Sequence, residues 1–261
     1  MNEILNDFAP ITLDEMSGIR LMNRTDTKFA TTMERLADLL VMARAEYRVQ
    51  DVNGVRNIPY YTMYFDTDNF DMYLEHSHGH TGRQKVRIRS YVNSGLNFLE
   101  VKTKDNHGRT KKKRMEMCDF TPLAPNCVGF DQESEESEAY FHFLQRHLKF
   151  APERLSPAIE NSFNRVTLVN NDKTERLTID TSLQFLNQST GRKYAFTDVA
   201  IIELKRDGLE QSPIMAMLNE LRIKPHKFSK YCLGSAMTNS ELPLNKFKLR
   251  LRAIEKMIER A

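Results

Sequence analysis

Four segments of this chain alternate charged and apolar residues one by one, and this alternation constrains the fold more than any other feature. Residues 85–89 read Lys-Val-Arg-Ile-Arg, and residues 98–104 read Phe-Leu-Glu-Val-Lys-Thr-Lys. Residues 176–180 and 202–205 repeat the pattern as Arg-Leu-Thr-Ile-Asp and Ile-Glu-Leu-Lys. Since successive side chains of a β-strand point to opposite faces, each segment predicts a strand with one charged face and one apolar face.

A single strand of this kind usually turns its charged face to solvent. The recurrence of cations, with carboxylates in the later strands, favours a closed barrel whose charged faces line the inside and whose apolar faces are covered by helices. Cations gathered there would repel one another and lose hydration unless a polyanion or a bound metal supplied opposite charge. Arginine offers paired donors and lysine a compact charge, which suits a chain of phosphates. A lone acid among them suits Mg²⁺ or Mn²⁺.

The remaining pattern predicts an α+β chain with about eight antiparallel strands and few helices. Strands are expected at about 24–30, 58–67, 83–92, 97–104, 110–118, 157–169, 174–180 and 194–206. Helices are expected after the capping boxes that start at Thr12 and Thr31, in the acidic segment 131–149, after Pro213 and at 244–260. We expect one domain, with an N-terminal helix at about 12–22, a barrel at about 23–238 and a C-terminal helix at about 244–260.

Composition permits this interpretation without requiring it. The 38 basic and 35 acidic residues give a net charge of +3, so the placement of the charges must carry the argument for a polyanion. The three cysteines form no CxxC pair, which favours a reducing compartment. The first residues lack a basic segment followed by an apolar run, and no apolar stretch approaches about 18 residues. We therefore expect a cytoplasmic protein without a membrane span of its own.

Three further features have both a purely structural and a functional interpretation. His76, His78 and His80 would align on a strand, but the neighbouring glycines favour a loop over a metal site. The run 111–114, Lys-Lys-Lys-Arg, favours a solvated edge, with a tunnel mouth for polyphosphate as the alternative; nucleic acid is disfavoured because no stacking aromatics flank it. The apolar stripe of the helix at 244–260 favours packing on the barrel over binding to a membrane surface.

Six short motifs in a fixed order give a family resemblance. They are Arg24-Thr-Asp-Thr-Lys28-Phe, Tyr64-Phe-Asp-Thr67, Lys85-Val-Arg87-Ile-Arg89, Phe98-Leu-Glu100-Val-Lys102, Ile202-Glu203-Leu-Lys205 and Lys227-Phe-Ser-Lys230-Tyr. Over about residues 20–238 the chain resembles the VTC domain, the polyphosphate polymerase domain of the vacuolar transporter chaperone complex. Each motif alone is common, whereas their joint order and spacing are specific.

The resemblance implies the triphosphate tunnel fold, an eight-stranded antiparallel barrel open at both ends. It implies transfer of the ATP γ-phosphate to inorganic polyphosphate with Mn²⁺ or Mg²⁺ and triphosphate as a further ligand, and it leaves open a membrane-protein partner. By position, phosphate contacts are expected from Lys28, Arg87, Arg89, Lys102, Arg165, Arg176, Lys227 and Lys230, with Lys205 on the same face as a weaker candidate. Glu203 is the expected metal ligand, and Arg87, Arg89, Lys230 and Glu203 are the expected catalytic residues. Arg24 and Asp26 replace the two acids of the wider superfamily's ExExK signature, which favours the VTC branch.

Other functions stay open at this point. A tripolyphosphatase would use the same tunnel with water as the acceptor. A non-catalytic polyphosphate-binding subunit of a membrane complex is disfavoured by the presence of Glu203 with Arg87 and Arg89. An RNA-binding protein is disfavoured because no base-stacking platform is evident. Lys227 and Lys230 are three residues apart, so both reach phosphate only if their segment is a turn or irregular.

Overall fold

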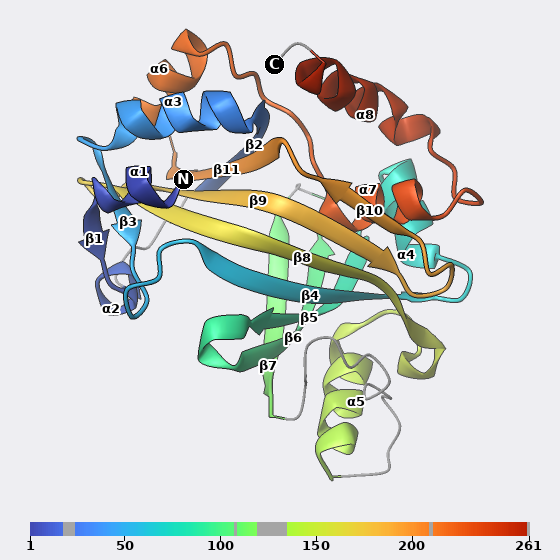
Figure 1. Cartoon of the computed structure of the whole chain (residues 1–261). Helices are drawn as coiled ribbons and strands as arrows, with labels where there is room; N and C mark the ends of the chain where they lie inside the picture. The colour runs from blue at the N-terminus through green and yellow to red at the C-terminus, as the bar shows by residue number, and fades with distance from the viewer. Residues whose placement is uncertain (18–23, 107–108, 119–134, 209–210, 260–261) are drawn as a thin grey trace.

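A large antiparallel sheet forms the centre of the computed structural model, which describes residues 1–17, 24–106, 109–118, 135–208 and 211–259. Eight strands follow one another in hydrogen-bonded order (Figure 1): β2 (Arg24–Thr32), β11 (Val199–Asp207), β9 (Glu175–Asn187), β8 (Leu155–Asn170), β4 (Ile58–Thr67), β5 (Gln84–Tyr91), β6 (Leu96–Lys104) and β7 (Thr110–Met117). Three short strands attach to this path, namely β1 (Ala9–Ile11), β3 (Tyr47–Gln50) and β10 (Lys193–Phe196). The predicted α+β class with a large antiparallel sheet is confirmed.

The sheet is curved but not closed. β2 and β7 are the two ends of the strand order, and no ladder joins them within the described residues. The predicted closed eight-stranded barrel is therefore wrong in its closure. The reason lies in β7, whose side chains from Lys111 to Arg114 are all exposed. A run of like charges on an edge strand opposes pairing with another strand.

Helices cover the apolar, convex side of the sheet in two places. α3 (Met33–Ala43) and α6 (Pro213–Glu220) pack on the apolar faces of β8, β9 and β11, where Leu168, Leu177 and Ile202 are fully buried. α5 (Glu135–His147) packs on the apolar faces of β5 and β6 (Figure 1). These helices bury the apolar half of each alternating strand and leave the charged half facing inward.

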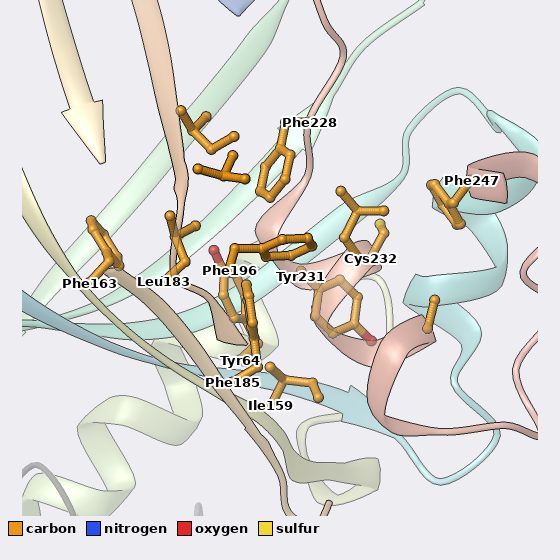
Figure 2. Packing of buried hydrophobic residues seen from close by; sticks show 14 of the residues in the cluster. Tyr64, Ile159, Phe163, Leu183, Phe185, Phe196, Phe228, Tyr231, Cys232 and Phe247 are labelled. Atoms are coloured by element: carbon orange, nitrogen blue, oxygen red, sulfur yellow. The ribbon is translucent and has the colours of Figure 1, made fainter. Parts of the chain in front are cut away.

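A third group of helices packs at one end of the inner face. α7 (Lys230–Thr238) lies against β8, β9 and β10, and its Tyr231 is buried among aromatic side chains that include Phe185 and Phe228 (Figure 2). α4 (Asp71–His78) and α8 (Asn245–Ile258) pack beside it. The carboxylate of Asp66 joins this group to β4, because it accepts hydrogen bonds from the Met72 and Tyr73 amides and from the Tyr231 hydroxyl.

α8 packs on the fold, as its apolar stripe predicts. Phe247, Leu251 and Ile254 are buried, whereas Ile258 at the end of the stripe is exposed. None of the helices in the described ranges combines the length and the apolar character that crossing a bilayer requires.

Most predicted strands agree with the structure, and four differences stand out. The segment 194–206 forms two strands, β10 and β11, instead of one. The predicted histidine loop is helical in α4. Thr32, not Thr31, caps α3 and accepts a hydrogen bond from the Arg35 amide. Unpredicted elements are α1 (Asn2–Asn6), β1, β3, α4, α7 and the single turns η1 (Val92–Ser94) and η3 (Pro152–Arg154).

The predicted capping box at Thr12 is confirmed. The Thr12 amide donates to Glu15 Oε2 at 2.8 Å, and the Glu15 amide donates to Thr12 Oγ1 at 3.2 Å. The helix that follows, α2, is described over Leu13–Ser17, and the rest of the predicted helix at 12–22 lies outside the described residues. So does the first part of the predicted acidic helix, residues 131–134.

Candidate phosphate-binding trough

The strand register places the charged residues of six strands on one face. Arg87 lies opposite Glu100, and Lys85 opposite Lys102. On the other half of the sheet Arg165 lies opposite Asp180, and Lys28 lies opposite Glu203. We call this inner face, together with Lys230 of α7, the basic trough. Its members are Lys28, Lys85, Arg87, Arg89, Glu100, Lys102, Arg165, Arg176, Asp180, Glu203, Lys205 and Lys230.

The two halves of the trough face each other. Lys102 on β6 and Glu203 on β11 are far apart in the strand order, yet their charges interact. Arg89 on β5 likewise feels the charge of Arg165 on β8. The curvature of the sheet therefore gathers cations from both halves around one space.

One ion pair in the trough joins β5 to β6. Arg87 donates to Glu100 Oε2 through Nε at 2.7 Å and Nη2 at 2.6 Å, and Lys112 contacts Glu100 Oε1 at 3.2 Å. The Glu100 side chain is only 2 % exposed. Burial alone would raise the pKa of Glu100, but Arg87 and Arg89 outweigh burial and hold this pKa below its ordinary value. Glu100 is thus a permanent anion that fixes Arg87.

A second cluster joins β8, β9 and α7. Arg165 donates to both oxygens of Asp180, at 2.6 and 2.8 Å, and Lys230 donates to Asp180 Oδ2. The Lys230 ammonium also lies 3.7 Å from the centre of the Phe163 ring. Burial lowers the pKa of Lys230 to about 7, although Asp180 opposes that shift. Lys230 is therefore a buried cation that can lose its proton near neutral pH.

The third cluster surrounds Glu203 on β11. Lys205 contacts Glu203 Oε2 at 2.7 Å, and Lys28 contacts Oε1 at 3.8 Å. Burial would raise the pKa of Glu203, but Lys28 and Lys205 hold it well below its ordinary value. The Glu203 side chain is 24 % exposed, whereas that of Asp180 is 6 % exposed. Of the clustered carboxylates, Glu203 keeps the most surface for a ligand.

Among the described residues, Lys85, Arg89 and Lys102 of the trough form no ion pair with a carboxylate, and Lys85 donates to Ser229 instead. Within the same part of the chain Arg89 makes one long hydrogen bond, 3.5 Å to Thr62 Oγ1. The Arg89 Nε is buried without an acceptor. Burial, with Arg87 and Arg165 nearby, lowers the pKa of Arg89 to about 10, and burial also brings the pKa of Lys102 well below its ordinary value. The trough therefore holds more positive charge than its own carboxylates balance.

The remaining predicted residues lie in different surroundings. Lys205 and Arg176 lie opposite each other in the β11–β9 register, next to Glu203 along the strand. Lys227 is exposed in the segment before α7, while Lys230 is the first residue of that helix. The irregular segment expected for both lysines is thus present at Lys227 and ends at Lys230.

Sequence reasoning left Asp180 and Lys85 out of the site, although it placed both on charged faces. Lys85 is half-buried and donates to Ser229 Oγ at 2.9 Å, just before α7. Asp180 receives Lys230 from a helix that the sequence did not predict. The alternation of 176–180 was the available signal for Asp180.

A divalent metal fits the trough at one place. No three His, Cys, Asp or Glu side chains gather into a metal cluster in the described ranges, and the three histidines of α4 and its end are no exception. Glu203 offers one carboxylate with free surface. Mg²⁺ is commonly bound by one or two carboxylates together with phosphate oxygens of the substrate. Glu203 would hold such an ion only jointly with phosphate.

Comparison with solved structures finds distant likeness. A proposed adenylyl cyclase from Hippeastrum, described as having a dominant triphosphatase activity, is 15% identical; the match covers 85% of this chain and 99% of that chain with a TM-score of 0.49. A proposed adenylate cyclase from Bacillus halodurans is 15% identical over 80% of this chain and 96% of that one, with a TM-score of 0.47. One from Vibrio parahaemolyticus is 10% identical over 82% and 99%, with a TM-score of 0.45.

Comparison with curated protein sequences finds no match. Comparison with family models finds the VTC domain, which matches residues 23–239. This range contains every strand of the sheet's main path, all members of the basic trough and Lys227. The chain belongs to the VTC domain family.

Proposed function

We propose that this protein is a metal-dependent polyphosphate polymerase, which transfers the ATP γ-phosphate to a growing polyphosphate chain lying in the basic trough. The observation that carries the proposal is the unbalanced positive charge around Arg89 and Lys102. A buried cation without a counter-ion is costly, and a chain of phosphates supplies that counter-ion. Membership of the VTC family supports polyphosphate as the polyanion.

Each cluster of the trough would have a distinct part in this reaction. Arg87 and Arg165 are held by buried carboxylates, so their guanidinium groups are already oriented for phosphate. Arg89 and Lys102 would neutralise the phosphate oxygens. A divalent ion held by Glu203 and phosphate would add charge stabilisation when bound. Phosphoryl transfer needs mainly alignment and charge stabilisation, which these residues can supply.

Lys230 would contribute charge close to the transferred group. Its ammonium is buried beside Arg165 and lies near Arg89, so it points into the same space as Arg89. The pKa of Lys230 is about 7, so a phosphate placed next to it would raise this pKa and keep the ammonium protonated. The cytoplasmic location and the membrane-protein partner stay predictions from the sequence.

Product analysis tests the proposed function directly. Purified protein is incubated with ATP and Mn²⁺, and the products are separated on a polyacrylamide gel. A ladder of polyphosphate supports the polymerase. If orthophosphate is released from tripolyphosphate and no polyphosphate ladder forms, the protein is a tripolyphosphatase instead of a polymerase. Binding of these ligands without turnover would indicate a non-catalytic subunit.

The matched variants for this assay are Glu203→Gln and Lys248→Gln. Glu203→Gln keeps the shape of the side chain and removes the charge proposed to hold the metal, so turnover should fall at least about 100-fold with the fold intact. Lys248 is exposed on α8, and its variant should keep full activity. Full activity of Glu203→Gln at saturating Mn²⁺ would contradict the role of Glu203.

A further inference from the structure

Aromatic rings form a row across four neighbouring strands at the edge of the basic trough. Phe163 on β8 stacks on Tyr60 on β4 with centroids 5.4 Å apart, Tyr60 lies 5.0 Å from Tyr91 on β5, and Tyr91 lies 5.9 Å from Phe98 on β6. Register pairs Tyr60 with both Phe163 and Tyr91, which places these rings on the same face as Arg89. The row therefore shares the inner face with the cations.

The two ends of this row differ in exposure. Phe163 and Tyr60 are buried in the core that α7 completes, so packing explains them. Tyr91 and Phe98 are only half-buried, and Leu96, opposite Tyr91 on the same face, is 44% exposed. We call Tyr91, Leu96 and Phe98 the apolar mouth. Its packing on the core is incomplete, so its solvent-facing surface needs another explanation.

Cations approach the row from both ends. Arg89 lies 5.7 Å from the Tyr60 centroid and 5.8 Å from that of Phe163. At the exposed end, Arg114 of the edge strand β7 lies 4.7 Å from the centre of the Phe98 ring. Arg114 is itself exposed, so its planar head can shift to admit a flat ligand next to Phe98. Sequence reasoning found no aromatic beside the run 111–114, because Phe98 reaches it from the neighbouring strand.

The spacing along β5 suits a molecule with a flat group at one end and phosphates at the other. Tyr91 follows Arg89 by two residues and Arg87 by four on the same face, which corresponds to about 7 and 13 Å of extended strand. We propose that the apolar mouth and Arg114 bind the nucleobase of a nucleoside triphosphate whose phosphates enter the trough at Arg89 and Arg87. Stacking on aromatic rings tolerates any base, so adenine and guanine should bind similarly.

This inference rests on the proposed function, because it assigns the donor end of the same site. The chain contains no tryptophan, so Phe98→Trp introduces a single indole into the mouth. Adding the non-hydrolysable β,γ-imido analogue of ATP should quench its fluorescence in a saturable manner, while inorganic imidotriphosphate should bind without comparable quenching. The control is Phe143→Trp, on α5 at the opposite side of the sheet, whose fluorescence should respond to neither ligand.

Affinities give the second measurement. Tyr91→Leu should weaken binding of the ATP analogue about fivefold or more, the factor that matches about 1 kcal/mol of base stacking. It should leave imidotriphosphate binding unchanged. Arg114→Ser, at an exposed position, gives the same comparison without touching the packed row, and it should shift binding of the ATP analogue in the same direction.

The outcomes separate this inference from the proposed function. If neither ligand binds wild-type protein, the phosphate-binding function itself fails. If both ligands bind wild type and the variants weaken both equally or neither, the nucleobase site is wrong while the phosphate site stands. If a single-stranded oligonucleotide binds the mouth more tightly than the ATP analogue, the surface belongs to nucleic acid and the inference is overturned.

Discussion

Asp180 and Glu100 show how single buried carboxylates organise the trough. Each accepts from an arginine and a lysine, Arg165 and Lys230 in one case, Arg87 and Lys112 in the other. A buried charge pair contributes little net stability, but removing one partner leaves the other uncompensated. The arginines held in this way are fixed in direction, whereas Arg89 depends on a ligand for its counter-charge.

This difference makes Arg87 and Arg89 a matched pair. Arg89→Met removes a buried charge without an acidic partner, so the free energy of unfolding should stay level or rise by about 1 kcal/mol. Arg87→Met leaves Glu100 with Lys112 alone and should lower the free energy of unfolding by about 3 kcal/mol. Urea denaturation compares the two variants. Triphosphate affinity of Arg89→Met should fall about tenfold or more, since charge-assisted hydrogen bonds are lost. A large loss of stability in Arg89→Met would show that a carboxylate does pair with Arg89.

Lys230 predicts a dependence of phosphate binding on pH. Burial places the pKa of Lys230 at about 7, below its ordinary value, so the ammonium is charged below pH 7 and loses its proton as pH rises. Affinity for imidotriphosphate should fall between pH 6 and pH 8 in wild-type protein, and calorimetry at both pH values measures the slope.

Two substitutions isolate the contribution of Lys230 from the titration of the ligand. Lys230→Met should reduce the change in imidotriphosphate affinity between pH 6 and pH 8 and weaken binding at pH 6, because the side chain is uncharged at both pH values. Lys230→Arg should also reduce this change and keep tight binding at pH 8, since arginine stays protonated. Equal slopes in all three proteins would place the titrating group elsewhere.

At the scale of elements, α7 depends on one close contact. A Cβ built on Gly234 would lie 2.4 Å from Phe185 Cδ1, and Phe185 is buried on β9. Only glycine therefore lets the helix approach the sheet closely enough to bring Lys230 to Asp180.

Gly234→Ala should destabilise the protein by about 1–3 kcal/mol, because overpacking of the core outweighs the helix propensity of alanine. Thermal unfolding measures the change. Phe185→Leu makes room, so the double variant should recover part of the loss, and the cycle gives the coupling between the two sites. Additive effects would mean that Gly234 and Phe185 do not limit each other.

The elements that the sequence predicted are those whose signal is local. Strands β4 to β7 agree with the expected ranges to within about two residues, because short runs of β-forming residues, and in β5 and β6 the alternation of charged and apolar residues, can be detected without knowledge of the fold. α7 was missed for the opposite reason. Residues 231–236 are all buried, so this helix has no polar face and no helical periodicity to detect. Because α7 was missed, the contact between Lys230 and Asp180, which lie 50 residues apart in the sequence, was missed as well.

For the whole molecule, the inner charged face could be predicted but the closure of the sheet could not. Alternation fixes which residues share a face, and the helices cover the other face as expected. Closure requires the first and last strands to pair, which depends on their edges. Lys111 to Arg114 make β7 a charged edge; the sequence shows this charged run but not that β7 is the last strand of the order.

The lack of a ladder between β2 and β7 bears on how a polymer would reach the trough. A closed barrel would admit a polymer only through one of its two open ends. Because no ladder bridges these two edges in the described parts of the chain, strand pairing does not bar entry there, and we expect a long molecule to enter from the side. Polyphosphate that carries a bulky protein cap at each end should therefore bind as tightly as the uncapped polymer, as measured by competition with labelled triphosphate. If polyphosphate capped at both ends fails to bind while polyphosphate capped at one end still binds, the polymer must enter by threading.

For the polymerase proposed above, side entry would change how a chain in mid-synthesis is held. A threaded polymer is held by topology, and it leaves only when an end passes through the protein. A polymer laid into an open groove is held by charge alone, so its residence time should shorten steeply as salt screens the cations. Chain length would then be set by the ionic strength around the protein, with short products in high salt and long ones in low salt.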